Sequence, residues 1–462
     1  MNENIFRQYD IRGVVGEDLD GDTFELIGKG LGTLVRDEFS GDKIIIGRDC
    51  RPTSEEFAGR VIDGLRSTGC NVIDLGMVPS PVVYYAIFKY LPDGKDAGAV
   101  ITASHNPKEF NGIKMRSTDK FIFGERIQRI KKTIKENAFI KAGNIGLHSE
   151  RDIVPDYVEE IVSRISLNRR MKIVVDTGNG TAGPIIKQIL DRMDCDVTYL
   201  FNEPDGTFPN HLPDPTVPEF TVEIRKKVVE IGADIGLALD GDGDRIGFVD
   251  DKGNLIGADI ILAILARDLL ERNPGEPVVY DVKCSMALIE EIEKRGGKPI
   301  ICETGYPFVQ RRMWNVGAKL GGEMSGHIYI GDNYYGYDDG IYSGLKVLEI
   351  LSRTKGTFSD LLSTIPTYVS TPEIRLDCSD DEAKFKIIED LGPYFEQQKD
   401  AKLESIDGYR LNYSDGWGLV RASNTQPILV VRFEAKTSER LEEIKDIFRK
   451  KLSEYPSVKV DF

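Results

Sequence analysis

The sequence predicts an α/β protein with three similar α/β domains, each with a mixed, mainly parallel sheet, and a small C-terminal α+β domain. Over the first three quarters of the chain, short Ile- and Val-rich runs alternate with amphipathic helical segments, which is the pattern of βαβ units. From about residue 369 the pattern changes to several short strands followed by one charged helix. A length of 462 residues also exceeds what one hydrophobic core supports.

The first strand–helix–strand unit shows the pattern clearly. Apolar, β-branched runs predict strands at residues 43–46 and 71–75. Between them, residues 54–68 carry apolar side chains at helical spacing, and Ser54 is the expected N-cap. The same order returns twice, with strands expected at 172–175 and 197–201 and then at 277–280 and 299–302.

The C-terminal region has a different order of elements. Short strands are expected at 409–414, 417–420 and 429–433, separated by polar loops, and a charged amphipathic helix at 438–452. These changes in pattern place the expected domains at 1–152, 153–254, 255–368 and 369–462.

Composition excludes several classes of function. The net charge of −16 argues against non-specific binding to nucleic acid or to an anionic membrane. The six cysteines include no C-x-x-C pair, so neither a disulfide framework nor a zinc site is indicated. No apolar run approaches the roughly 20 residues that span a bilayer, and the first residues lack a signal-peptide core. We expect a cytoplasmic protein.

A serine loop follows the apolar run at residues 98–102. The segment Thr102-Ala-Ser104-His105-Asn-Pro107 places the Ser104 hydroxyl in the loop that leaves a buried strand, and Lys114 lies shortly after it. A hydroxyl in this position could carry a phosphoryl group covalently.

An acidic loop lies between two predicted strands, 235–239 and 246–249. Asp240, Asp242 and Asp244 alternate with glycines, so their carboxylates can converge on one side. Such a set suits Mg²⁺, and Arg245 beside it could meet phosphoryl oxygens. A solvated acidic turn is the alternative. An EF-hand fails because Arg245 stands where that loop needs glycine.

Two further polar loops suit a sugar phosphate. Gly322-Glu323-Met-Ser325-Gly-His327 offers groups that recognise hydroxyls, and His105 and His327 are two of only four histidines. The loop that begins at Arg421, between two strands, offers a guanidinium, hydroxyls and turn N–H groups, which together could hold a phosphate.

A glycine-rich segment raises an alternative function. Gly178-Asn-Gly180-Thr-Ala-Gly183 fits the dinucleotide fingerprint, and Glu203 lies at the distance of a ribose-binding acid. Because no other segment suggests hydride chemistry, a tight turn is preferred to a nicotinamide-dependent oxidoreductase.

Taken together, the motifs resemble those of the α-D-phosphohexomutases, and within them the phosphomannomutase/phosphoglucomutase group. The resemblance covers the whole chain and implies four domains around a central cleft. It rests on Tyr9-Asp-Ile-Arg12-Gly13, Gly47-Arg-Asp-Cys-Arg51, Thr102–Pro107, Asp240–Arg245, Gly322–His327 and Arg421–Thr425.

The resemblance also implies the site residues. Ser104 would be the phosphoserine, and its phosphoryl oxygen would bind Mg²⁺ together with Asp240, Asp242 and Asp244. The other implied residues are, near the reacting groups, His105, Arg245, Arg12, Lys114 and His327, and, in substrate binding, Tyr9, Lys283, Tyr306, Glu323, Ser325, Arg421, Ser423, Asn424 and Thr425.

The implied reaction converts hexose 6-phosphate to hexose 1-phosphate through a hexose 1,6-bisphosphate, which also serves as activator. The substrate is a small sugar phosphate, and the protein is expected to be a monomer or a weak homodimer. Lys114 or His327 would be the base, and Lys114 would then need a lowered pKa from a neighbouring cation. Glu-Met-Ser in the sugar loop favours mannose and glucose over glucosamine, whereas Tyr306 and Gln310 depart from the family pattern. A phosphoglucosamine mutase is the alternative.

Overall fold

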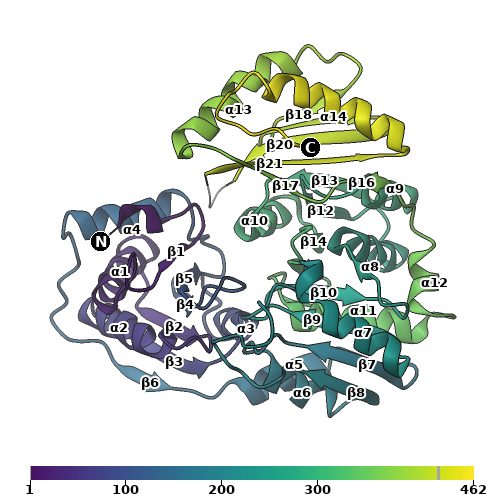
Figure 1. Cartoon of the computed structure of the whole chain (residues 1–462). Helices are drawn as coiled ribbons and strands as arrows, with labels where there is room; N and C mark the ends of the chain where they lie inside the picture. The colour runs from purple at the N-terminus through teal and green to yellow at the C-terminus, as the bar shows by residue number, and fades with distance from the viewer. Residues whose placement is uncertain (1, 424–426) are drawn as a thin grey trace. The chain divides into compact units, whose positions relative to one another are not determined.

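The computed structural model describes residues 2–423 and 427–462 (Figure 1). The chain forms two compact units. The first unit joins Met1–Ile261 to Ser325–Leu362, and the second joins Leu262–Met324 to Ser363–Phe462.

The first unit begins with a six-stranded mixed sheet. Parallel pairing joins β2 to β3, β2 to β4 and β3 to β6, whereas β5 is antiparallel to both β1 and β4. Helices α1, α2 and α4 cover one face and α3 the other (Figure 1). The strands, in sheet order, are β1 (Ile11–Val14), β5 (Phe110–Arg116), β4 (Ala97–Ile101), β2 (Lys43–Arg48), β3 (Asn71–Met77) and β6 (His148–Glu150), and the helices are α1 (Gly21–Leu34), α2 (Ser54–Ser67), α3 (Ser80–Tyr90) and α4 (Glu125–Lys135).

Helices α1 and α2 pack through glycine. A Cβ added at Gly28 of α1 would lie 2.4 Å from the carbonyl oxygen of Val61, and one at Gly64 of α2 would lie 2.2 Å from that of Glu25. The two backbones therefore approach more closely than any side chain would allow.

This approach predicts opposite effects for two glycine-to-alanine changes. Gly28→Ala should lower the free energy of unfolding by roughly 1–3 kcal/mol, because the helices must separate. Gly59→Ala, on the exposed side of α2 where a Cβ would meet nothing within 4 Å, should raise it by about 0.5–1 kcal/mol. Urea denaturation followed by circular dichroism measures both, and equal stability of the two variants would contradict the close approach.

The second sheet of the first unit supports the acidic loop. Strands β7, β8 and β9 are parallel, and β10 returns antiparallel to β9. Helix α11 packs against β9 and β10. The strands, in sheet order, are β11 (Leu255–Ile256), β10 (Ile246–Val249), β9 (Ile235–Leu239), β7 (Met171–Asp176) and β8 (Cys195–Leu200). The other elements of this unit are β15 (Ile328–Ile330), α5 (Val154–Val162), α6 (Gly183–Leu190), α7 (Val222–Ile231), α11 (Gly340–Arg353), α12 (Phe358–Leu362), and short helices at Glu3–Ile5, Val35–Phe39 and Pro218–Phe220.

The second unit contains a parallel set of strands and an antiparallel sheet. Strand β12 (Pro277–Asp281) pairs in parallel with β13 (Lys298–Cys302) and β14 (Leu320–Gly322). In the antiparallel sheet, β16 (Val369–Ser370) and β17 (Ile374–Asp377) pair with β21 (Ile428–Ala435), which is followed by β20 (Gly416–Ala422), β19 (Tyr409–Tyr413) and β18 (Lys402–Glu404). The helices are α9 (Met286–Lys294), α10 (Tyr306–Val316), α13 (Asp381–Phe395) and α14 (Ser438–Leu452), and α8 (Ala258–Arg272) crosses between the units.

The predicted fold class is confirmed: α/β elements with mixed sheets precede an antiparallel C-terminal domain. The domain boundaries remain predictions. The N-cap prediction is wrong, because Thr53 occupies that position and the Ser54 hydroxyl instead donates to Asp49. Within the described part of the chain, every helix is too short or too polar to span a bilayer.

Candidate active site

Ser104 lies in the loop that follows β4, in a buried position with an unusual backbone. Its φ is +52°, a conformation that few side-chain-bearing residues adopt. The hydroxyl donates to Asp240 Oδ2 at 2.7 Å, and His105 Nδ1 lies 3.0 Å from it. Burial, and then the charges of Arg245 and Arg12, hold the pKa of His105 well below its ordinary value, so the imidazole beside the hydroxyl is neutral.

A buried arginine shapes the serine loop. The Arg51 guanidinium donates to the main-chain oxygens of Ser104, Asn106, Pro107 and Phe110 at distances of 2.6–3.0 Å. Asp49 pairs with its Nε at 3.1 Å. The unusual turn at Ser104 is therefore held by a side chain from the loop that follows β2.

Arg12 approaches the same loop from β1. Its guanidinium donates to the Asn106 side chain at 2.6 Å and to Asp10 at 2.7 Å. The predicted residue Tyr9 lies half-buried just before β1.

The acidic loop joins β9 to β10 and is fully enclosed. Asp240, Asp242 and Asp244 have no exposed surface, so the solvated-turn interpretation is wrong. Two other segments hold the loop: Ser80, at the start of α3, donates to Asp242, and the Thr181 N–H donates to the Gly241 carbonyl.

The glycine-rich segment at 178–183 has a structural role in this arrangement. A Cβ at Gly180 would lie 2.7 Å from the Gly241 carbonyl oxygen. The glycine therefore allows this segment to pack against the acidic loop, and no nicotinamide site is needed to explain it.

Lys114 of β5 lies within the acidic group. Its ammonium contacts Asp242 Oδ2 at 2.7 Å and also Asp244. Although burial opposes its charge, these two carboxylates raise the pKa of Lys114 well above its ordinary value. The expectation of a lowered pKa is therefore wrong: in this arrangement Lys114 is a held ammonium and not a base.

The three carboxylates fit a divalent cation. Each offers one oxygen within 4.8 Å of the others, and Asp242 Oδ1 and Asp244 Oδ1 are buried without a hydrogen-bond partner among the described residues. Three carboxylates against the one ammonium of Lys114 leave an excess of negative charge, and oxygen donors of this kind suit Mg²⁺. Burial, and then the neighbouring carboxylates, raise the pKa of Asp240 well above its usual range, and a bound cation would offset this effect.

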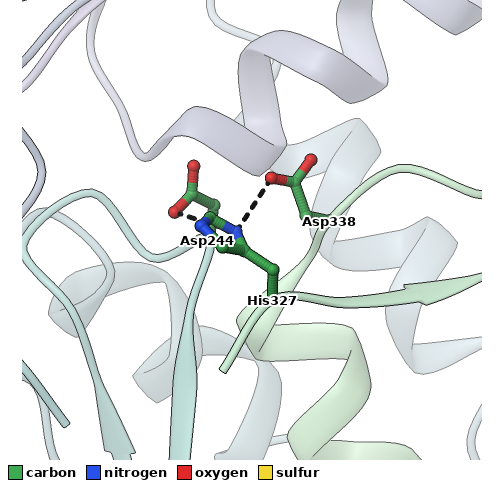
Figure 2. Close-up of side chains that lie close together, drawn as sticks. All are labelled: Asp244, His327 and Asp338. Carbon is green, nitrogen blue, oxygen red and sulfur yellow. Dashed lines mark ion pairs between the residues drawn. The ribbon is translucent and has the colours of Figure 1, made fainter. Parts of the chain in front are cut away.

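His327 lies between two carboxylates (Figure 2). Its Nδ1 is 3.0 Å from Asp338 Oδ2 and 3.7 Å from Asp244 Oδ1. Its other ring nitrogen, Nε2, accepts a hydrogen bond from Arg245 Nε at 2.9 Å. The structure thus brings His327 and Arg245 together beside the acidic loop.

A second set of predicted residues lies in the second unit. Lys283 is buried and pairs with Glu373 at 3.2 Å and with Asp281 at 3.8 Å. The charge of Lys283 lowers the pKa of Glu373 to about 2. Glu323 accepts from the Gly305 N–H at 2.9 Å, just before Tyr306 begins α10.

Arg421 lies in strand β20, and not in the loop where it was expected. Asp407 accepts from its Nε at 2.8 Å and from the Thr304 N–H at 3.0 Å. Ser423 follows the strand, and its carbonyl accepts from Lys384. Asn424 and Thr425 lie outside the described residues.

The remaining predictions concern the segments around 306 and 325. Tyr306 and Gln310 are both buried on α10. Ser325 is half-buried before His327 in the first unit.

Comparison with known proteins covers the chain in four parts. Residues 3–141, 155–253 and 257–368 match the alpha/beta/alpha domains I, II and III of phosphoglucomutase/phosphomannomutase, and residues 373–451 match its C-terminal domain. A phosphomannomutase/phosphoglucomutase of Pseudomonas putida is 43% identical over 459 residues, 98% of this chain and 96% of the relative.

The chain belongs to the phosphoglucomutase/phosphomannomutase family.

Other family members agree with this assignment. A phosphoglucomutase of Neisseria gonorrhoeae is 37% identical over 456 residues, 99% of this chain and 98% of the relative. A solved structure of a phosphoglucomutase/phosphomannomutase family protein from Burkholderia thailandensis has a TM-score of 0.92 at 40% identity and covers all of both chains. An N-acetylphosphoglucosamine mutase of Aspergillus fumigatus, at 14% identity and a TM-score of 0.60, shares the fold.

Several charged residues of the candidate site had no predicted role. Asp338 and Arg116 pair at 2.8 Å beside His327, and Asp407 and Asp281 hold the loop at 304. Each is a single charged residue without a glycine-rich motif around it, so local sequence offered no signal. Arg51, by contrast, lies in a segment that the resemblance had already singled out.

Proposed function

We propose that this protein interconverts the 6-phosphates and 1-phosphates of mannose and glucose, with Ser104 carrying the phosphoryl group and a hexose 1,6-bisphosphate as intermediate. The observation that carries the proposal is the Ser104 hydroxyl, 2.7 Å from Asp240 in a buried set of three carboxylates. Family membership supports the same chemistry.

In the first transfer, the bond between phosphorus and Ser104 Oγ breaks and a bond to the sugar hydroxyl oxygen forms. The hydroxyl proton passes to a base, and Oγ finally takes a proton. The reverse sequence at the other end of the bisphosphate restores phosphoserine. Because charge on the phosphoryl oxygens must be offset throughout, Arg245 and Lys114 contribute as cations near Ser104.

Asp240, Asp242 and Asp244 would hold Mg²⁺, together with a phosphoryl oxygen on Ser104. When bound, the ion supplies Lewis-acid stabilisation of phosphoryl charge. The chain's own contribution is to enclose the group, keep water out and fix the hydroxyl beside the carboxylates.

Of the two bases predicted from the sequence, we favour His327. Lys114 is held as an ammonium by Asp242 and Asp244, whereas His327 Nε2, which accepts from Arg245 Nε, carries no hydrogen and becomes available as a base once Arg245 turns to a phosphoryl oxygen. A neutral imidazole of this kind can take a proton without first losing one.

The sugar is tested by comparing substrates directly. We expect turnover of mannose 1-phosphate and glucose 1-phosphate at comparable kcat/KM, and much slower turnover of glucosamine 1-phosphate, in coupled assays with added bisphosphate. Faster turnover of glucosamine phosphate would instead support the phosphoglucosamine mutase alternative. No turnover of any hexose phosphate would contradict the proposal.

We also propose that Arg421 binds the phosphate that is not being transferred. Arg421→Ala should raise KM for glucose 1-phosphate about tenfold to a hundredfold, since a hydrogen bond between charged groups contributes about 1.5–3 kcal/mol. Steady-state kinetics measure this change. Lys402→Ala, which removes an exposed cation from the same domain, is the control and should leave KM unchanged. Equal effects of the two changes would argue against an anchor.

A further inference from the structure

Asp338 is a fully buried carboxylate just before α11, and its orientation is set by an arginine. Arg116 Nη2 donates to Asp338 Oδ1 at 2.8 Å, and the Arg116 guanidinium lies 3.9 Å from the centre of the Tyr84 ring. Main-chain pairing between Tyr329 and Asp338 places Asp338 beside His327. The other carboxylate oxygen, Oδ2, lies 3.0 Å from His327 Nδ1 in an ion-pair contact (Figure 2).

The opposite side of the imidazole defines which nitrogen carries the proton. Arg245 Nε donates to His327 Nε2 at 2.9 Å. An arginine remains protonated and can only donate. Nε2 must then be the acceptor and carries no hydrogen, so the ring hydrogen belongs on Nδ1, on the side of Asp338.

We propose that Asp338 is a positioning residue, which fixes His327 in the tautomer with hydrogen on Nδ1 and thereby holds the Arg245 guanidinium on Nε2. This inference rests on the proposed function, in which Arg245 meets the phosphoryl oxygens. Arg116, Asp338, His327 and Arg245 then form one connected set, in which each member orients the next.

Asp338 is better suited to this role than Asp244, the other carboxylate near the ring. Asp338 Oδ2 lies 3.0 Å from His327 Nδ1, whereas Asp244 Oδ1 lies 3.7 Å from it. Asp244 is also paired with Lys114. Asp244, His327 and Asp338 could in principle hold a cation, but Arg116 and Arg245 are already bound to Asp338 and His327 and would repel one.

The Asp338→Asn change should move the ring hydrogen of His327 from Nδ1 to Nε2. Arg116 needs an acceptor, so the asparagine oxygen should stay with Arg116 and its NH₂ group should face His327 Nδ1. Nδ1 must then accept, and the ring hydrogen moves to Nε2, where it meets the donor of Arg245. The bond between His327 and Arg245 is lost although the volume of the side chain is unchanged.

The experiment combines nitrogen NMR of the full-length protein with kinetics. In protein labelled with ¹⁵N-histidine, long-range ¹H–¹⁵N spectra distinguish protonated from unprotonated ring nitrogens, and His327→Gln assigns the His327 signals. We expect the His327 ring of the wild type to carry its hydrogen on Nδ1 only. In the Asp338→Asn variant, we expect the His327 ring to carry it wholly or partly on Nε2. The kcat of the Asp338→Asn variant should fall roughly tenfold to a hundredfold, and its KM for glucose 1-phosphate should stay within about twofold of the wild-type value.

Asp339→Asn is the matched control. Asp339 is the next residue and is equally buried, but it caps α11 by accepting from the Tyr342 N–H and bonds to Tyr157. This variant should keep the wild-type tautomer and kcat. A loss of kcat in both variants, with the His327 tautomer unchanged, would indicate a structural effect and overturn the inference.

The remaining outcomes separate this inference from the proposed function. An inactive wild-type protein would contradict the proposed function itself. An active wild-type protein with hydrogen on Nε2 would overturn the inference without any variant, so the test holds even if Asp338→Asn folds poorly. Unchanged kcat in Asp338→Asn with a reversed tautomer would also overturn it.

Discussion

Ser104→Ala is expected to abolish the mutase activity, lowering kcat by at least about a thousandfold, because no other group can take the place of a covalent carrier. The protein as isolated should also lose one phosphoryl group from its intact mass. Alanine keeps the Cβ at the position with φ of +52°, so the fold of the loop, held by Arg51, should be retained.

Ser117→Ala is the matched control for this change. Ser117 directly follows β5 in the same sheet and is buried, and its hydroxyl has no hydrogen-bond partner within the described segments. That variant should keep both the phosphoryl group and the activity. A fully active Ser104→Ala protein, or one that still carries the phosphoryl group, would exclude Ser104 as the carrier.

Removal of the metal should have the second largest effect. EDTA should stop turnover reversibly, and Asp242→Asn should lower kcat by roughly a hundredfold to a thousandfold, with a higher Mg²⁺ concentration needed for half-maximal activity. The reason is that Asp242 supplies one of the three converging oxygens and also binds Lys114 and Ser80.

Asp250→Asn is the matched control, because it removes a buried carboxylate of the same region that is not a predicted metal ligand. Asp250 follows β10 and caps a turn by accepting from the Lys252 and Asn254 N–H groups. Activity measured against free Mg²⁺ should be unchanged in this variant. EDTA-resistant turnover in the wild type would mean that the acidic loop does not serve as a catalytic metal site.

Sequence predicted well those segments whose structure is determined by residues close together in the chain. The acidic loop was bounded correctly by β9 and β10, because two apolar strands enclose a short polar stretch. The helix at 438–452 likewise has the predicted bounds, since its apolar spacing is local and its cap, Thr437, is the residue just before it.

The errors arise where distant residues decide the outcome. Lys114 has a raised pKa because Asp242 and Asp244, far along the chain, lie against it. Ser54 is the first residue of α2 and not its cap, and its buried hydroxyl donates to Asp49 of the loop after β2, a contact that helical spacing does not reveal. Asp338 could not be assigned from sequence, since its partner Arg116 is separated from it by 222 residues. Pairing of this kind depends on tertiary structure, which periodicity does not encode.

The backbone around Lys283 has a mechanical consequence. Arg410 donates to the carbonyls of Val282 and Cys284, Arg432 donates to that of Lys283, and Trp417 packs beneath Val282. All three of these side chains belong to the antiparallel sheet that also carries Arg421. Any movement of that sheet must therefore either carry the Lys283 ammonium with it or break several buried hydrogen bonds, so Lys283 and Arg421 should move together as one rigid part.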